Sequence, residues 1–548
     1  MSQDRWWKRP GKIHSAIPEV AEQLRKGEIN RREFLRTATL LGMSASAAYV
    51  LAGKMTGMHI VPRALAAGHA RRGGNLRVSM TVMEFTDPAI YDWSEKGNLA
   101  RQFIDPMVQI SPDNIATPHL AESWEVSEDL KTWTFNLRQG IKWSNGDDFN
   151  ADDIIFNVTR WIDPKTGSSN EGRFSAVKEP PEKIDDHTVR FNLARAELAL
   201  PESMGDYPAL IVNRRFSDDG GDLSKNPVGT GAFEMVENIV GERAVMRRRA
   251  GKHWTGDVYL DEITFIDLGG DANAELNAFI SGQIDVNYQT TVQQVPAIRE
   301  IPSLDVHSTA TAQTGLLRMR LSEEPWGNAK LRQAVLACVD HQQLVDIAYQ
   351  GLGLAGEDHH VSPVHPAYAE LPRSKQDIGR ARRLLAEAGY PNGIELEVQC
   401  VDSPAWEQAT TLALVEMLRP AGITANVNVL PGKTYWDKWD TWPISFTSWT
   451  HRALGTQVLN LAYRSGVTWN ECAYSNPEFD RLLDEAGGIV DVNKRRGVMA
   501  QLEKILQDDA ILVQPFWRNV FTTSTQKVKN YRVQPALEML FNQVWLDA

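Results

Sequence analysis

Apolar and polar residues alternate with a period of two in several short segments of the chain, and this pattern predicts β-strands. Residues 76–80 read Leu-Arg-Val-Ser-Met directly after two glycines, and residues 133–137 read Trp-Thr-Phe-Asn-Leu. A Gln-Gly pair follows the second segment and leads into a short run at residues 141–143. We therefore expect the first strand of a sheet at 76–80 and a hairpin over 133–143.

Other segments carry apolar residues at helical spacing behind residues that cap helix N-termini. Asn150 precedes such a run and has Asp153 at the third helical position, near the positive end of the helix dipole. Asp340 and Gln343 have the spacing of a capping box, and Asn476 is followed directly by a proline. We expect a helix to begin after each of these three caps.

Helices and strands alternate in the second half of the chain. A helical pattern around Ala381 and Leu385 precedes apolar strands at 394–398 and 423–429, which are separated by a helical pattern over 405–418. This alternation is typical of an α/β lobe with a mainly open sheet. Because 548 residues exceed the size of a typical single domain, we expect two or three packed lobes.

Charge is unevenly distributed along the chain. The formal net charge is −12, although residues 1–66 hold eleven Lys and Arg against five Asp and Glu. The remainder is therefore strongly acidic, which repels nucleic acid and anionic membranes and argues against both as partners. The three cysteines, Cys338, Cys400 and Cys472, match no metal or redox spacing and indicate no disulfide framework.

The amino-terminal segment has the features of an export signal. Residues 31–36 read Arg-Arg-Glu-Phe-Leu-Arg, which resembles the twin-arginine signal, and a mildly apolar run rich in small residues follows at 37–57. Residues 64–66 read Ala-Leu-Ala, the small-x-small pattern that signal peptidase cuts after, so the mature chain is expected to start near Ala67. We predict that residues 1–66 are a twin-arginine-type signal segment and that the mature chain is periplasmic.

A permanent membrane anchor is the alternative interpretation of this stretch. It would need about 20 strongly apolar residues, and Lys54 interrupts the run. Twin-arginine substrates are generally exported already folded, which implies folding in the reducing cytosol and fits the few cysteines.

Four separated motifs point to a family. The longest, at 120–146, contains Ala-Glu-Ser-Trp-Glu-Val-Ser-Glu-Asp and ends in Gly-Ile-Lys-Trp-Ser-Asn-Gly. The others are Pro-Val-Gly-Thr-Gly-Ala-Phe at 227–233, Leu-Arg-Gln-Ala-Val at 331–335 and Ser-Pro-Val-His-Pro at 362–366. Together and in this order they resemble the peptide/nickel-type solute-binding proteins, the extracellular solute-binding family 5, over nearly all of residues 74–548.

The resemblance implies an α/β fold of the periplasmic-binding-protein type II class. Two main lobes would surround a cleft, and a smaller lobe would be inserted. Lobe I would comprise residues 67–109, 216–312 and 510–548, lobe II the insertion 110–215, and lobe III residues 313–509.

The resemblance also implies a function without chemistry. The solute would lie between lobes I and III and would be enclosed by hinge closure, and the closed form would be recognised by the membrane permease subunits of an ABC importer. No catalytic residue and no cofactor are implied. We expect a monomer whose partners are a small-molecule solute and those permease subunits.

The chain departs from the family at the solute contacts. Dipeptide binders of the family pair the ligand's amino group with an aspartate near a Gly-Trp segment, and its carboxylate with an arginine. The comparable segment here, residues 446–452, lacks the aspartate, and residues 401–406 contain no arginine. These departures argue against standard dipeptide contacts.

Tryptophan is concentrated where those contacts are missing, with six between residues 406 and 469. Indole faces suit sugars, apolar rings and ammonium groups, although large aromatic residues also pack cores. Trp449 and Trp469 are expected pocket walls because both lie in loop-like segments. Arg452 is expected to hold a carboxylate, and Glu471 or Asp402 an amine. The predicted ligand-binding residues are Phe85, Asp87, Asp402, Trp406, Trp436, Trp449, His451, Arg452, Trp469 and Glu471.

Three functions stay open at this point. The first is a transport receptor for a peptide-like or amine-bearing solute, and the second a receptor for an oligosaccharide or another aromatic-stacking ligand. The third is a secreted enzyme or chaperone on the same scaffold. Asp358, His359, His360 and His365 lack the spacing of a metal site, and no nucleophile-elbow motif occurs, so neither catalytic nor metal-binding residues are predicted.

Overall fold

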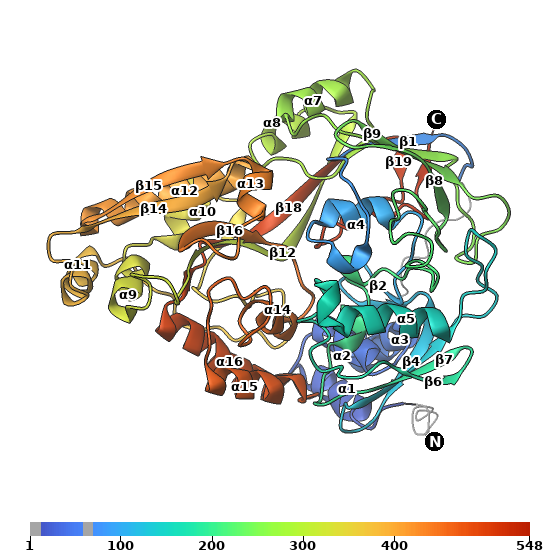
Figure 1. The fold of residues 1–548 in the computed structure, drawn as a ribbon, viewed down its shortest axis with the longest axis horizontal. Helices are drawn as coiled ribbons and strands as arrows, with labels where there is room; N and C mark the ends of the chain where they lie inside the picture. The colour runs from blue at the N-terminus through green and yellow to red at the C-terminus, as the bar shows by residue number, and fades with distance from the viewer. Residues whose placement is uncertain (1–12, 58–69, 548) are drawn as a thin grey trace.

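The computed structural model describes residues 13–57 and 70–547, and a mixed sheet of twelve strands runs through it (Figure 1). The strands are β1 (Asn75–Ser79), β8 (Phe233–Ile239), β9 (Arg243–Arg248), β10 (Glu262–Ile266), β11 (Val286–Asn287), β12 (Leu304–Met319), β13 (Gly353–Ala355), β14 (Ile394–Val401), β15 (Ile423–Leu430), β16 (Ile444–Trp449), β17 (Leu512–Val513) and β18 (Phe516–Thr525). Ten lie in the order β15-β14-β16-β12-β18-β11-β1-β10-β9-β8, while β13 pairs with β18 and β17 with β12.

One end of this sheet belongs to lobe I, which is built on β1 and β8 to β11. The predicted first strand is β1, which pairs in parallel with β10 and β11 and buries Leu76 and Val78. Around the sheet lie α4 (Ser94–Ala100), α7 (Ala272–Ile280), α8 (Val295–Arg299), the short 3-10 helices η3 (Pro88–Ile90) and η5 (Tyr207–Ala209), and the pair β19 (Val528–Lys529) and β20 (Trp545–Leu546).

The other end belongs to lobe III, in which β14 and β15 are parallel and α12 (Ala405–Leu418) connects them. This strand–helix–strand order and the helix at 405–418 are as predicted. The expected caps also form, since Asp340 accepts a hydrogen bond from the Gln343 amide and Asn476 accepts one from the Glu478 amide, both at 3.0 Å. The remaining helices are α9 (Ala329–Ala337), α10 (His341–Tyr349), α11 (Ile378–Glu387), η6 (Arg419–Ala421), α13 (Gly432–Trp436), α14 (Gly455–Ala462), α15 (Pro477–Gly487) and α16 (Val492–Asp509).

The inserted lobe has a separate antiparallel sheet of four strands in the order β4-β5-β7-β6, with bounds β4 (Ala121–Val126), β5 (Thr132–Leu137), β6 (Glu182–Asp185) and β7 (Thr188–Asn192). Helix α5 (Ala151–Ile162) begins at the predicted cap, where Asn150 and Asp153 form a capping box. Smaller elements of the region are β2 (Val108–Ile110), β3 (Ala116–Pro118), η4 (Pro164–Thr166) and α6 (Leu200–Ser203).

The predicted hairpin after β5 is wrong. β5 pairs with β4 on one side and with the distant β7 on the other, while residues 141–143 form no strand and Lys142 makes only an isolated bridge with Asp148. Pairing with β7 places Phe191 directly opposite Trp133, and both are buried. Burial of these facing aromatic side chains stabilises the long-range pairing over the nearby one.

Strands β12 and β18 join the two main lobes. Residues 304–310 of β12 pair with β18, residues 314–319 pair with β16 of lobe III, and the ladder is irregular between Ala310 and Thr314. β18 pairs with β13 near its start and with β11 of lobe I near its end. Such an irregularity bends a strand locally and redirects its side chains, so we call residues 310–314 the hinge bulge.

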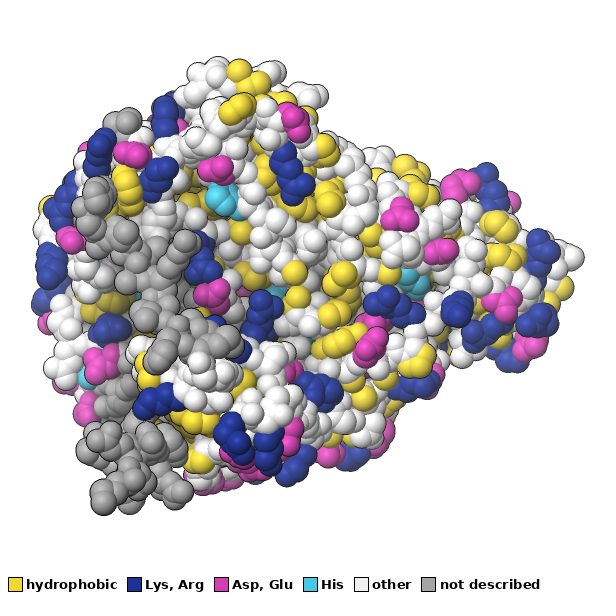
Figure 2. Space-filling view, turned by 180° about the vertical axis from the view of Figure 1, so that it is seen from behind, with side chains coloured by type: hydrophobic (Ala, Val, Ile, Leu, Met, Phe, Trp, Pro, Cys, Tyr) yellow, Lys and Arg dark blue, Asp and Glu magenta, His cyan; other side chains and the backbone are white. Residues whose placement is uncertain are grey.

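This α/β architecture, with two main lobes and a smaller inserted lobe, is the one expected from the sequence; the residue boundaries of the lobes stay predictions. Figure 2 shows basic and acidic side chains interspersed over one face of the molecule. Such mixing agrees with a soluble surface rather than a single-sign binding patch.

The amino-terminal segment folds into three helices, α1 (Ile17–Lys26), α2 (Arg31–Leu40) and α3 (Ala45–Thr56), which lie beside the inserted lobe (Figure 1). Phe34 and Leu35 of the twin-arginine-like motif are buried, whereas Arg32 is exposed. No helix in the described part of the chain has the length and apolar character needed to cross a bilayer. The predicted cleavage pattern at 64–66 lies outside the described residues, and the signal segment stays a prediction.

These helices contact both sides of the molecule. Toward the inserted lobe, the Arg36 Nε donates to the Asn114 carbonyl at 2.9 Å, and the Trp124 Nε1 donates to the Leu40 carbonyl at 3.0 Å. The Arg36 Nη1 also donates to the Val364 carbonyl of lobe III at 2.7 Å.

Two further contacts reach lobe III. Glu33 pairs with Arg496 of α16 at 2.6 Å, and the Gln23 amide donates to Asp491 at 2.7 Å. The segment therefore bridges the inserted lobe and lobe III.

A chain that begins at Ala67 is expected to separate the inserted lobe from lobe III more widely than the full-length chain does when no solute is present, because these bridging contacts are gone. The distance between spin labels at the exposed positions Lys183 and Arg419, measured by double electron–electron resonance, checks this. Arg496→Gln in the full-length chain is the matched control, since it removes one contact and should give a smaller change. Identical distance distributions for the two lengths would contradict the bridging.

Candidate ligand-binding site

A cavity of about 180 Å³ lies between the lobes, with Gln313 of the hinge bulge and Ser94 and Glu95 of α4 among its lining residues. It is lined from lobe I, from the two joining strands and from lobe III. Its lining residues are Asp92, Trp93, Ser94, Glu95, Tyr207, Tyr288, Gln289, Gln313, Ser403, Pro404, Glu407, Trp436, Trp439, Ser448, Trp449, Thr450, Arg452, Trp469, Arg518 and Leu537. Residues from both main lobes thus form one chamber.

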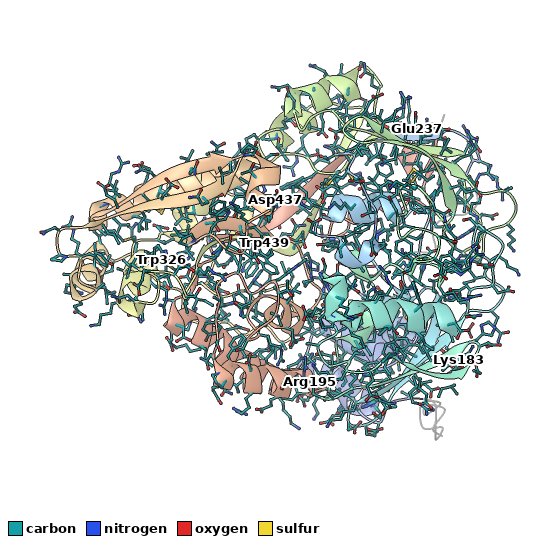
Figure 3. All side chains as sticks on the ribbon, viewed as in Figure 1. Lys183, Arg195, Glu237, Trp326, Asp437 and Trp439 are labelled. Carbon is teal, nitrogen blue, oxygen red and sulfur yellow. The ribbon has the colours of Figure 1, made fainter. Side chains whose placement is uncertain are left out.

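Five tryptophans form its principal wall. The ring centroid of Trp439, which is labelled in Figure 3, lies 6.2 Å from that of Trp436, 6.2 Å from that of Trp449 and 6.0 Å from that of Trp469. Trp93 of lobe I meets Trp436 edge-on at 5.6 Å. The rings meet in tilted and edge-to-face pairs, which aromatic quadrupoles favour, and indole rings that line a cavity can contact an apolar or cationic part of a solute.

A buried ion pair behind this wall fixes Trp449. The Trp449 Nε1 donates to Glu471 Oε1 at 2.7 Å, and the Arg318 Nε lies 3.1 Å from Glu471 Oε2. Both charged side chains are buried, and burial raises the pKa of Glu471 although Arg318 opposes this. Glu471 therefore holds Trp449 in place. Its carboxylate is bound by Trp449 and Arg318 and lies outside the cavity lining, away from where it was predicted to bind an amine.

Arg452 lines the cavity but already has a carboxylate partner. Its Nε lies 3.2 Å from Asp206 Oδ2, and the Nε of Arg173 lies 2.7 Å from the same oxygen. Burial alone would raise the pKa of Asp206, yet the two guanidinium groups lower it to about 2. These three residues connect lobe III to the inserted lobe. Arg452, which was predicted to bind a carboxylate of the solute, is thus already paired with a carboxylate of the protein.

Four of the ten residues predicted from the sequence line the cavity: Trp436, Trp449, Arg452 and Trp469. Trp449 is the last residue of β16 rather than part of a loop, whereas Trp469 lies in a turn after α14. Contact with a solute stays a prediction for these residues.

Two predicted residues of lobe I lie away from the cavity lining. Phe85 is buried in the lobe I core against Phe103, because the chain after β1 turns inward. Asp87 caps η3 and pairs with Arg160 of α5, so its charge is used between lobe I and the inserted lobe.

Three predicted residues of lobe III also lie outside the lining. Asp402 is exposed beyond the end of β14, and Trp406 is buried in the lobe III core beneath Arg518. The Nδ1 of His451 accepts a hydrogen bond from the Ala312 amide of the hinge bulge at 2.9 Å. Trp406 and His451 thus have partners within the protein, and the exposed Asp402 lies outside the lining.

Sequence reasoning missed Glu95, Glu407 and Arg518. Glu407 lies on the first turn of α12, facing inward, and Arg518 lies within the apolar strand β18. The sequence did contain a signal for Arg518: it is a charged residue inside a segment whose pattern is that of a buried strand. Because a buried charge is costly, such a residue usually has a partner. Glu95 carried no comparable signal.

The histidine-rich segment 358–360 and His365 are buried with protein partners. The Nδ1 of His360 lies 2.9 Å from the Tyr463 hydroxyl, and the Nε2 of His365 lies 3.0 Å from the Arg452 carbonyl. Among the residues that the structure describes, no group of three or more His, Cys, Asp or Glu has the arrangement of a metal site. These histidines support the lobe III core.

Comparison with known proteins identifies the family. The family described as bacterial extracellular solute-binding proteins, family 5 Middle, matches residues 116–470. Among curated proteins, heme-binding protein A of Haemophilus influenzae is 26% identical over 460 residues, covering 76% of this chain and 82% of that protein. The dipeptide-binding protein of Escherichia coli K12 is 24% identical over 466 residues, covering 78% and 86%.

A solved structure shares the fold. The periplasmic binding protein DppA from Helicobacter pylori, in complex with the peptide STSA, superposes with a TM-score of 0.80 at 22% identity and covers 87% of this chain and 99% of that chain. This likeness confirms the expected periplasmic-binding-protein type II architecture. Because the family match spans more than half of the residues, the chain belongs to the bacterial extracellular solute-binding proteins, family 5.

Proposed function

We propose that the chain is the periplasmic substrate-binding component of an ABC importer and that it captures a peptide-like or amine-bearing small solute by closure of its lobes. The observation that carries the proposal is the chamber itself, which draws its walls from both main lobes and from the strands that join them. A composite chamber of this kind is complete only when the lobes are together, so solute binding and closure are linked.

Membership of the family supports a binding role, and relatives named as peptide-binding proteins support a peptide-like solute. In this role the output is the closed form that permease subunits recognise, and no bond is made or broken. We further infer that the protein acts as a monomer, since one chain supplies the whole chamber.

The solute-free protein is expected to gain thermal stability on addition of a pool of amino acids and dipeptides, because a ligand that binds only the folded state at 100 times its Kd adds about 2.7 kcal/mol. Differential scanning fluorimetry measures the shift, and native mass spectrometry identifies the retained solute. Small-angle scattering on the same samples should show a more compact protein. An unchanged melting temperature together with unchanged scattering would contradict the proposal.

Trp469→Ala is expected to weaken binding of the retained solute about tenfold, because removal of one stacking indole costs about 1.4 kcal/mol. Isothermal titration calorimetry measures the affinity. Trp326→Phe is the matched control, since Trp326 is buried in the lobe III core away from the chamber. Equal loss in both variants would indicate a general effect on folding rather than a pocket wall.

We infer export by the twin-arginine route. The motif at 31–36 supports this inference, and so do the three buried free cysteines, which suit folding before export. Relatives carry the word periplasmic in their names, which agrees with the destination.

Replacement of Arg31 and Arg32 together by lysine is expected to move the protein from the periplasmic to the cytosolic fraction. Immunoblotting of the two fractions measures this, and Arg25→Lys with Lys26→Arg is the control because it keeps two basic residues outside the motif. Continued export of the double variant would show that another route is used.

A further inference from the structure

The charges that line the chamber fall into two groups. Asp92 pairs with Lys96, and Arg452 pairs with Asp206, so these charges are compensated within the protein. Glu95, Glu407 and Arg518 have no ion-pair partner within 4.0 Å among residues 13–57 and 70–547. A buried ionisable group without a partner is costly in its charged form, unless it is protonated or a solute supplies the opposite charge.

Arg518 is a fixed cation at the hinge bulge. Its side chain is 5% exposed and its guanidinium lies 4.0 Å from the ring centroid of Trp406, which holds it in place. The Nε donates to the Tyr349 hydroxyl and the Nη1 to Gln313 Oε1, both at 3.2 Å. All these partners are neutral, so the positive charge remains for a ligand.

Glu407 does not neutralise this cation. Its side chain is 1% exposed, its Oε2 has no hydrogen-bond partner, and burial raises its pKa to about 8 although Arg518 opposes this. At neutral pH it is mostly a protonated carboxyl group, which can donate a hydrogen bond to an anion beside Arg518.

Glu95 provides the opposite charge on the lobe I side. It lies on the first turn of α4, where Ser94 Oγ contacts its Oε2 at 3.3 Å and also lies 2.7 Å from the Tyr288 hydroxyl. Burial raises the pKa of Glu95, and the nearby Lys96, whose ammonium group pairs with Asp92, offsets this only in part. An ammonium group placed against it would stabilise the charged form.

We propose that the solute is a compact zwitterion whose carboxylate binds Arg518 at the hinge and whose ammonium group binds Glu95 of lobe I, with its side chain against the tryptophan wall. This proposal rests on the proposed function and adds that the solute carries one carboxylate and one ammonium group. Guanidinium groups bind carboxylates through two parallel hydrogen bonds, and aromatic faces attract ammonium groups, so each part of the solute has a matched surface. The chamber of about 180 Å³ favours a short molecule over an extended peptide.

The two charged contacts come from different parts of the molecule. Arg518 lies where β18 passes from lobe III to lobe I and is held by Tyr349 and Trp406 of lobe III, whereas Glu95 lies on lobe I. The segments 401–406 and 446–452, which lack the expected dipeptide contacts, then contribute mainly apolar and neutral surface. The missing aspartate and arginine are thus replaced at different places in the fold.

Three pools of amino acids and dipeptides test the proposal: unmodified, C-terminally amidated and N-acetylated. The variants are Arg518→Gln and Glu95→Gln, with Arg215→Gln and Glu84→Gln as exposed controls outside the chamber. Wild type and both controls should bind the unmodified pool at least tenfold more tightly than either modified pool. Arg518→Gln should bind unmodified and amidated pools alike, and Glu95→Gln should bind unmodified and acetylated pools alike.

Arg518→Lys separates charge from folding. It keeps the cation without the planar fork and is expected to retain the preference for a free carboxylate at reduced affinity. Retention of that preference by Arg518→Gln, or of the preference for a free amine by Glu95→Gln, would overturn the proposal. If no pool binds the wild type and no retained solute is found, the proposed function itself fails, which is a different result.

Discussion

The irregular pairing at residues 310–314 is the constraint on which the rest of the structure depends. β12 pairs with β18 on one edge over residues 304–310 and with β16 on its other edge over residues 314–319, and Thr314 pairs with both, so the sheet continues from lobe I into lobe III through this irregular stretch. Thr311 Oγ1 donates to the Arg518 carbonyl at 2.7 Å and accepts from the Gln313 amide at 2.9 Å, so the bend is held by hydrogen bonds rather than left loose. The same bonds direct Gln313 and Arg518 toward the chamber, and the site is therefore built into the joint.

Charge pairing decides which side chains around the chamber are structural. Arg318 with Glu471 and Arg452 with Asp206 each bury opposite charges in contact. Removing one partner of such a pair typically costs about 3–5 kcal/mol, because the other charge stays buried and unpaired. These residues therefore hold the tryptophan wall and the contact between lobe III and the inserted lobe, and their charges are already paired within the protein. Arg518, by contrast, is buried without an ion-pair partner among the described residues, so its charge is available to a solute.

The sequence predicted elements well where the signal is local. The helix over 405–418, the caps at Asp340 and Asn476 and the strands beside them form as expected, because periodicity and capping act within one or two turns. The sequence-based prediction failed after β5. There the partner strand β7 is distant in the sequence, and the burial of Phe191 opposite Trp133, 58 residues apart, selects the pairing. For the site, the sequence indicated tryptophans that line the cavity, but it gave no sign of the ion pairs of Arg452 and Glu471, since pairing between distant segments has no local signature.

The amino-terminal helices add a second constraint across the same joint. Arg36 donates to carbonyl groups of both the inserted lobe and lobe III, and its neighbours Phe34 and Leu35 are buried beside it. Burial lowers the pKa of Arg36 to about 10, so the guanidinium stays charged and needs both acceptors. On the proposed twin-arginine route, Phe34 and Leu35 would be read by the export machinery, and because both are buried, α2 would have to leave the body first. Its departure would remove the Arg36 contacts to the inserted lobe and to lobe III.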